Sequence, residues 1–242
     1  MVSASAFGGF TAIAPGSWIE IYGDDLTAAA ATQWSGSQFM NGVAPTQVGD
    51  VTVSVGGTAA FIDYISPSQV NALVPSSAPV GPVEITLTNS IGTSIGYPIY
   101  VDQTEPGLLA PSSFMVNGKQ YVVAQFTDGT YALPENAIPG VPSRPATAGD
   151  TLLIYGVGFG TVTGGFTAGT IVTAQNATTA PVEFFFNDTA ATPFYAGLAP
   201  SFTGLYQFNV VVPAVTTNSA LPISFTLGGV KGTQTLYIAA QN

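Results

Sequence analysis

The sequence predicts an all-β fold made of two similar antiparallel β-sandwiches in tandem, and two observations support this. The first is an internal repeat, in which residues 12–26 align with residues 145–159 and Tyr22 matches Tyr155. The second is a series of short segments that alternate apolar and polar residues and are separated by Gly and Pro. The repeat indicates two copies of one unit, and the alternation is typical of antiparallel strands.

A shorter repeated element follows the first one at nearly the same distance in both halves. Gln69 and Asn71 match Gln207 and Asn209, each pair lying in a segment that ends in Val-Pro. Because the element recurs at the same place, we interpret it as a structural motif in which the amides are buried or cap a turn, and we favour this over a ligand site.

Several segments fit the strand pattern closely. Residues 51–55, 83–88 and 223–227 each alternate apolar with polar residues and end at a Gly or Asn turn signal. Each is expected to be a half-buried strand entering a turn. The sequence shows no amphipathic helix of ordinary length, and each half has the size of an immunoglobulin-like sandwich, about 100 residues.

The interval 102–148 separates the repeats and is rich in proline. Proline lacks an amide donor and fixes φ, so we expect an extended crossover here. Residues 121–126, followed by Asp128-Gly129, predict a hairpin within it. We therefore predict two domains, residues 1–104 and residues 105–242, with the crossover and the hairpin belonging to the second.

Charge usage excludes several classes of partner. The 242 residues include 3 Lys and Arg against 13 Asp and Glu, for a net charge of -10. So few basic residues cannot neutralise nucleic acid or an anionic membrane surface, and the apolar runs are too short to insert into a membrane. A charged fraction of 7% suits a secreted or cell-surface protein, although Met1-Val2-Ser3-Ala4 does not have the features of a signal peptide.

The residue inventory argues against catalysis. The chain has no His and no Cys, which removes the usual general base, the Ser-His-Asp triad and the common metal ligands. Carboxylates remain, and turn formation explains most of them. We therefore predict no enzymatic activity and no cofactor. Calcium stays open, although no DxDxDG-like loop favours it. The carboxylates that could form a catalytic pair are Asp24, Asp25, Asp63, Asp128, Asp150 and Asp188.

Residues 156–160 contain three glycines that follow a predicted strand. They lack the spacing and the following helix of a nucleotide-binding loop. We interpret this segment as a turn or bulge.

The repeat also predicts which side chains face outward. If Ile19 and Ile21 face the core, their neighbours and the equivalent residues of the second half face away from it. Exposed aromatics with little charge around them indicate burial against the sister half or another chain. The candidate interface residues are Trp18, Tyr22, Leu153, Tyr155 and Phe185.

Longer stretches of the chain carry an ordered set of motifs. In the first half they are Ala14-Pro15-Gly16-Ser17, residues 21–23, Gly49-Asp50 and residues 64–71; in the second half they are residues 124–129, 148–150, 195–200 and 204–210. In this combination the chain resembles the uncharacterised C-terminal domain family of secreted acidobacterial, Solibacter-type proteins. The resemblance implies tandem immunoglobulin-like modules of the IPT/TIG kind on exported proteins, and the family has no assigned catalytic residues to transfer.

Two functions fit these features. The first hypothesis is an extracellular structural or adhesive protein that assembles with copies of itself or with another extracellular protein. The alternative is a carbohydrate-binding module of a secreted protein, which would hold a polysaccharide on Trp18, Trp34 or exposed tyrosines. Aromatics beside a shallow face lined by Asn and Asp would favour the sugar.

Overall fold

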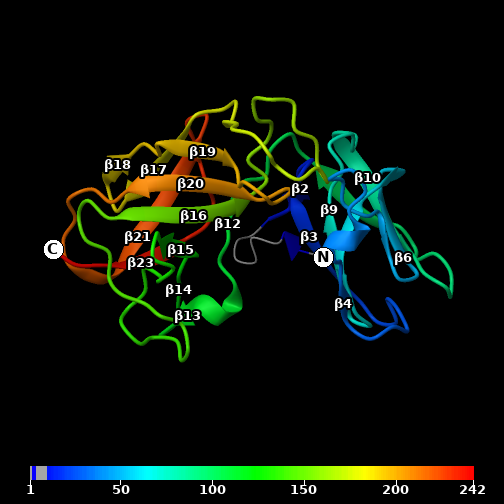
Figure 1. Ribbon diagram of the computed structural model, residues 1–242, viewed down its shortest axis with the longest axis horizontal. Helices are drawn as coiled ribbons and strands as arrows, with labels where there is room; N and C mark the ends of the chain where they lie inside the picture. Colours follow the sequence, from blue (N-terminus) through cyan, green and yellow to red (C-terminus); the bar gives the residue numbers. More distant parts are fainter. Residues whose placement is uncertain (1, 4–9) are drawn as a thin grey trace.

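A computed structural model describes residues 2–3 and 10–242 (Figure 1). Strands hold 44% of the residues and helices 3%, the latter as two 3-10 turns, η1 (Gly36–Gln38) and η2 (Ser112–Phe114). The predicted all-β class with antiparallel sheets is therefore confirmed. Within the described ranges, no helix is long and apolar enough to span a membrane.

The first half of the chain forms two sheets. Their strand orders are β1-β3-β9-β8-β4 and β2-β11-β10-β6-β5, with β7 paired to β6. Every pairing is antiparallel except that of β2 with β11. The strands are β1 (Val2–Ser3), β2 (Ala12–Ile13), β3 (Trp18–Tyr22), β4 (Thr32–Gln33), β5 (Gln47–Val48), β6 (Val51–Val55), β7 (Thr58–Ala59), β8 (Phe61–Ile65), β9 (Gln69–Leu73), β10 (Gly81–Thr88) and β11 (Tyr97–Val101).

The second half repeats this plan with antiparallel sheets. One sheet has the order β12-β16-β20-β19, with β15 paired to β16, and the other has the order β18-β17-β21-β22, with β23 paired to β21; β13 and β14 form a separate ribbon. The strands are β12 (Gly107–Leu108), β13 (Met115–Val116), β14 (Lys119–Gln120), β15 (Ala124–Phe126), β16 (Thr151–Val157), β17 (Val182–Phe186), β18 (Thr189–Ala191), β19 (Tyr195–Leu198), β20 (Tyr206–Val211), β21 (Asn218–Leu227), β22 (Val230–Lys231) and β23 (Leu236–Ala240).

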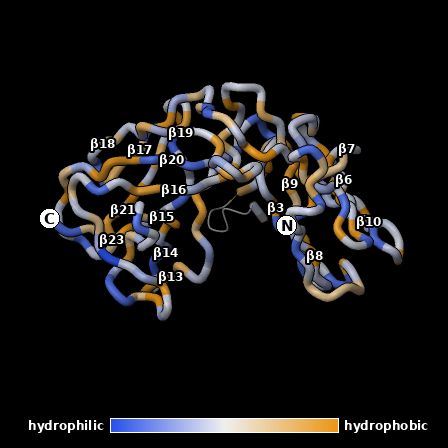
Figure 2. Tube along the Cα trace, viewed as in Figure 1, coloured by the Kyte–Doolittle hydropathy of each residue, from blue (hydrophilic) through white to orange (hydrophobic). Residues whose placement is uncertain are grey.

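The buried apolar residues form two main clusters, one within residues 13–101 and one within residues 108–240. Each cluster takes side chains from two sheets, so the sheets pack face to face. In the first half Ile19 of β3 and Val53 of β6 share a core, whereas in the second Phe208 of β20 and Phe184 of β17 do so, with ring centroids 5.4 Å apart. The alternation behind this arrangement is visible in Figure 2, where hydrophobic and hydrophilic residues interleave along the strands. The boundary predicted between residues 104 and 105 falls between the clusters and stays a prediction.

The two halves contact each other through loops. The indole Nε1 of Trp18 donates to the carbonyl of Thr203 at 3.0 Å. The amide of Ala44 donates to the carbonyl of Gly169 at 2.7 Å, and the amide of Ile171 donates to the carbonyl of Gly42 at 2.9 Å. These contacts link β3 and the segment before β5 in the first half to loops of the second half.

Close packing at Gly204 tightens this junction. A Cβ at this position would lie 2.3 Å from Cδ1 of Leu73 and 3.0 Å from Nε1 of Trp18. Only a residue without a side chain allows such an approach. Trp18, predicted as a candidate interface residue, is therefore half-buried against the sister half.

The crossover also uses a glycine for close approach. Gly158, directly after β16, has a φ of +78°, and its carbonyl accepts from the amide of Glu105 at 3.0 Å. A Cβ at Gly158 would lie 2.1 Å from the carbonyl oxygen of Glu105. The segment is a turn against which the crossover packs, as its interpretation as a turn or bulge predicts.

The predicted hairpin is present but shorter than 121–126. Its first strand is β15, and the amide of Phe126 donates to the carbonyl of Thr130 across the Asp128-Gly129 turn. Tyr121 instead forms a bridge to Tyr237. The predicted strand 121–126 is therefore divided: its end forms β15, whereas Tyr121 at its start lies beside Tyr237.

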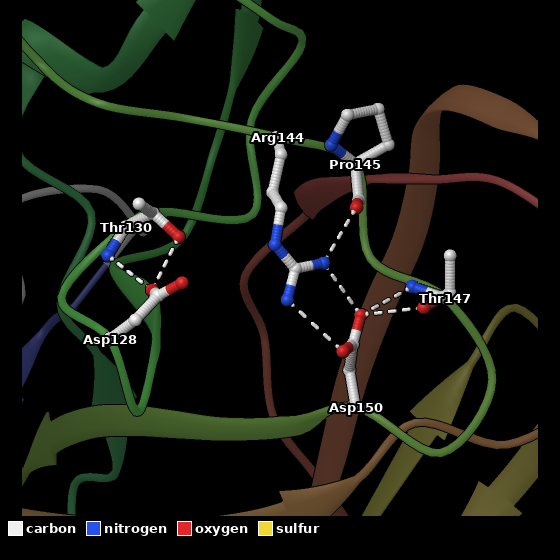
Figure 3. A network of polar contacts seen from close by, with 6 residues as sticks. All are labelled: Asp128, Thr130, Arg144, Pro145, Thr147 and Asp150. Carbon is white, nitrogen blue, oxygen red and sulfur yellow. Dashed lines mark hydrogen bonds and ion pairs between the residues drawn. The ribbon is translucent and has the colours of Figure 1, made fainter.

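A polar network fixes the start of β16 (Figure 3). The guanidinium of Arg144 donates to both carboxylate oxygens of Asp150 at 2.8 and 3.0 Å and lies 3.6 Å from the ring centroid of Phe126. The amide of Thr147 donates to Asp150 at 2.7 Å. The hydrogen bond from Arg144 holds the pKa of the Asp150 carboxyl well below its usual range, and the bonds from Thr147 add to this effect.

The first half has a simpler version of the same turn. Ser17 occupies the position that corresponds to Asp150, and its Oγ accepts from the amide of Ala14 at 3.2 Å and donates to the Ala14 carbonyl at 2.7 Å. In both halves a polar side chain bonds to the backbone three residues before it, which stabilises the entry into the repeated strand.

The Asp150→Asn variant is expected to lose about 1 kcal/mol of unfolding free energy at pH 7, a value reduced for the solvent screening of a partly exposed pair. Because the pKa of Asp150 is lowered in the folded protein, its contribution is complete above the unfolded pKa of about 3.9 and declines as the pH falls below it. Urea unfolding should therefore show a difference in unfolding free energy between variant and wild type that is largest at pH 7 and becomes smaller toward pH 2. Asp24→Asn, which changes an exposed turn residue, is the control; an equal gap at both pH values would contradict the assignment.

Candidate functional site

The repeated Gln-x-Asn element lies on an interior strand of a sheet in each half. Gln69 and Asn71 are on β9, and Gln207 and Asn209 are on β20. In each pair Nε2 of the glutamine donates to Oδ1 of the asparagine at 2.8 Å. All four side chains are half-buried on the outward face of their strand.

Two tyrosines flank the amide pair in the first half. Tyr22 on β3 pairs with Gln69, and Tyr64 on β8 pairs with Asn71. Paired residues on antiparallel strands point to the same side of the sheet, so the four side chains share the outward face. We call Tyr22, Tyr64, Gln69 and Asn71 the first quartet.

The second half repeats this arrangement residue for residue. Tyr155 on β16 pairs with Gln207, and Tyr195 on β19 pairs with Asn209. We call Tyr155, Tyr195, Gln207 and Asn209 the second quartet. Both quartets therefore place one tyrosine on each strand that neighbours the strand with the amides.

The geometry leaves hydrogen-bonding capacity free for a ligand. With Nε2 of the glutamine and Oδ1 of the asparagine bonded to each other, the glutamine retains an acceptor oxygen. The amide nitrogen of Asn209 retains its N–H donors, whereas that of Asn71 also bonds to the carboxylate of Asp63 and retains one N–H. The tyrosines stand on strands about 10 Å apart, that is, two strand spacings. Each quartet is thus a shallow strip with a donor and an acceptor between two aromatic rings.

The surroundings of the first quartet are acidic. The hydroxyl of Tyr22 donates to Oε2 of Glu20 at 2.5 Å, which raises the pKa of Tyr22 to about 12. Asp63, the extra residue of a bulge in β8, accepts from Nε2 of Gln33 at 3.1 Å. Burial raises the pKa of Asp63 although Gln33 and Asn71 hydrogen-bond to its carboxylate.

The surroundings of the second quartet are neutral. Leu153 occupies the position that corresponds to Glu20 and pairs with Asn209 on one side and Gln125 on the other. The hydroxyl of Tyr195 donates to the carbonyl of Leu198 at 2.6 Å, which fixes the ring. Burial raises the pKa of Tyr155. The two quartets therefore share their amides and tyrosines but differ in charge.

The acidic side chains do not form a facing pair. Glu20 on β3 pairs with Asn71 on β9, and Asp63 is on β8, so the strand with Asn71 lies between the two carboxylates. Among the described residues, no group of three or more acidic side chains is placed to hold a metal ion.

The other predicted surface residues lie elsewhere. Phe185 is half-buried on the outward face of β17, between Ala190 of β18 and Ser224 of β21. Trp34 packs edge-on between Trp18, at 5.5 Å, and Phe39, at 4.8 Å. The two tryptophans thus form an aromatic cluster near the junction.

A pocket of about 520 Å³ lies between the halves. Phe159 and Tyr206 belong to its apolar part, and the hydroxyls of Thr161 and Thr179, 2.8 Å apart, belong to its polar part. None of the quartet residues lines it. The quartets are therefore separate surface sites.

The sequence reveals only part of the quartets. The amide pairs and the tyrosines of β3 and β16 belong to the aligned repeat, whereas Tyr64 precedes Gln69 by five residues and Tyr195 precedes Gln207 by twelve. This difference in spacing hides the equivalence of Tyr64 and Tyr195. Glu20 and Asp63 carry no motif that would mark them as neighbours of the amides.

No family model matches the sequence, and no curated protein matches it. Among solved structures, the chain is similar to the SGBP-B protein of the mixed-linkage glucan utilization locus of Bacteroides ovatus, solved with a mixed-linkage heptasaccharide. The TM-score is 0.42 at 11% identity, over 97% of this chain and 46% of that one. The chain thus spans less than half of that protein, and a likeness at this level carries no functional argument.

Proposed function

We propose that this protein is a non-catalytic carbohydrate-binding protein that holds a neutral polysaccharide on its two quartets. The observation that carries the proposal is the duplicated amide pair between two tyrosines. Sugar hydroxyls both donate and accept hydrogen bonds, which suits a strip that offers one acceptor and one donor. The apolar faces of sugar rings suit aromatic side chains, which combine a large apolar surface with a polar end.

Charge supports a neutral ligand. With a net charge of -10 and three basic residues, the chain offers little to pair with a carboxylate or sulfate. Glu20 and Asp63 beside the first quartet would repel an anionic polymer. The same features support a secreted or cell-surface location for the protein, since polysaccharides are found there and the surface is poor in charge.

Self-association is the second candidate function, and one observation favours it. Apolar side chains are exposed around β10 and β11, where Ile91 and Ile95 are 76% and 94% exposed and Tyr97 and Tyr100 are about half exposed. Ile91 and Ile95 lie in the loop between β10 and β11, and Tyr97 and Tyr100 lie on β11, whose sheet is not the one that carries the first quartet. A structural role through this patch is therefore compatible with carbohydrate binding.

Affinity electrophoresis with paired polysaccharides tests the proposed function. Gels would contain a neutral polymer (starch, hydroxyethylcellulose, xylan, mannan or glycol chitin) or the carboxymethylated form of the same backbone. At least one neutral polymer is expected to retard the protein, and its carboxymethylated form should retard it less because of repulsion. Unchanged mobility in every neutral polymer, or equal retardation by both forms, would contradict the proposal.

A further inference from the structure

We propose that the two quartets bind a repeating polysaccharide at the same time, so that the partner is a long polymer and short oligosaccharides bind weakly. This inference rests on the proposed carbohydrate-binding function and deepens it.

The two sites have equivalent amide pairs and tyrosines. Both amide pairs have the same internal hydrogen bond, 2.8 Å long, and both occupy the central position between two tyrosine-bearing strands. Sites with the same donors, acceptors and rings recognise the same chemistry. A ligand that satisfies both must therefore present that chemistry more than once, as the repeating unit of a polymer does.

The junction between the two halves fixes the spacing of the sites. Trp18 donates to Thr203, Ala44 donates to Gly169, and Ile171 donates to Gly42. Gly204 packs without space for a side chain. A fixed spacing makes the second binding event intramolecular without the entropy cost of ordering a flexible linker, and such linkage raises the overall affinity by about 10²–10⁴-fold when the geometry permits it.

The two sites differ in the charge of the residues beside them. Glu20 and Asp63 add two acceptors beside the first quartet, whereas Leu153 and Gln125 flank the second. Carboxylates make stronger hydrogen bonds to hydroxyls than neutral groups do. The first quartet is thus expected to hold an oligosaccharide more tightly than the second.

Calorimetry and polymer binding together test the inference. Cellohexaose, maltohexaose, xylohexaose, mannohexaose and chitohexaose would each be titrated into the intact protein, and binding to the corresponding insoluble polymers would be measured by depletion. We expect two sites per chain for at least one hexaose and about 100-fold tighter binding, per repeating unit, to its polymer. The variants are Gln69→Ala with Asn71→Ala for the first quartet, and Gln207→Ala with Asn209→Ala for the second.

Each double variant is expected to keep one hexaose site and to lose most of the gain in polymer affinity. Thr86→Ala, on the other sheet of the first half opposite Ser54, is the matched control and should leave both measurements unchanged. Gly204→Ala should loosen the junction through the contacts with Leu73 and Trp18, which would weaken polymer binding while both hexaose sites persist. The length dependence of binding provides a second test without any variant, because the affinity should rise steeply once an oligosaccharide spans both quartets.

The outcomes separate the two levels of the proposal. If no hexaose and no polymer binds, the proposed function and this inference both fail. Two other results would overturn simultaneous binding but leave carbohydrate binding intact. In one, hexaoses bind at two sites but polymers bind no tighter per repeating unit. In the other, the wild type has one hexaose site, which one of the double variants removes.

Discussion

The Gly158→Ala variant is expected to lose about 2–5 kcal/mol of unfolding free energy. Gly158 has a φ of +78°, a left-handed conformation that costs a residue with a side chain about 1–2 kcal/mol. In addition, the new Cβ would lie 2.1 Å from the carbonyl oxygen of Glu105, and the shift of the backbone that this requires costs about 1–3 kcal/mol more. The crossover would be pushed away from β16.

Gly165→Ala provides a matched control for this prediction. Gly165 has a φ of +70°, and a Cβ there would have no atom within 4 Å. This variant should therefore lose about 1–2 kcal/mol, which is the cost of the left-handed conformation alone. Urea or guanidinium unfolding at neutral pH measures both. Equal losses for the two variants would show that close packing between the crossover and β16 contributes nothing.

Removing both amide pairs is expected to produce the largest effect on binding. The variant carries four changes to alanine, at Gln69, Asn71, Gln207 and Asn209. Each quartet loses two hydrogen bonds to the ligand of about 1 kcal/mol each, so the affinity of each site for a hexaose should fall about 30-fold. Binding to an insoluble polymer should fall further, because the gain from two linked sites is lost as well.

The fold of this variant should remain intact. In each pair both partners of the internal hydrogen bond are removed together, so neither is left without the other. Asp63 loses the hydrogen bond from Asn71 but keeps the one from Gln33. A melting temperature within a few degrees of wild type would separate loss of binding from loss of structure, with Thr86→Ala measured in parallel. Unchanged affinity in the folded four-alanine variant would show that the amides do not contact the ligand.

The sequence predicts the repeated strands well because their signals are local. Tyr22 and Tyr155 lie in an aligned segment that becomes β3 and β16, and the Gln-x-Asn elements lie in segments that become β9 and β20. Alternation also gives the correct inward and outward faces for these strands. The fold class and the central residues of the site follow from these short-range patterns.

The rest of the site depends on strand pairing, which the sequence does not reveal. Tyr64 lies beside Asn71 because a bulge at Asp63 shifts the register of β8, and Tyr195 lies beside Asn209 across a much longer connection. The hydrogen bond from Gln69 to Asn71 lies on the outward, half-buried face of β9, and the repeat alone does not reveal which residues of the neighbouring strands lie beside it.

Tertiary contacts also decide which of the predicted interface aromatics contacts the other half of the chain. Trp18 contacts the sister half because the loop with Thr203 and Gly204 reaches it, while Phe185 stays half-buried on its own sheet. Alternation assigns both residues to outward faces. It contains no information on which outward face a distant loop will cover.

Side-chain amide signals in NMR spectra of the isotope-labelled protein test the central claim most directly. Gln and Asn NH2 groups give resolved pairs of signals, which the two double variants would assign to the quartets. On titration with the tightest-binding neutral hexaose, the signals of Gln69, Asn71, Gln207 and Asn209 are predicted to shift together, whereas that of Gln47, on the opposite sheet, stays in place. Saturating ligand that leaves all four signals unmoved and shifts those of another surface would contradict the account.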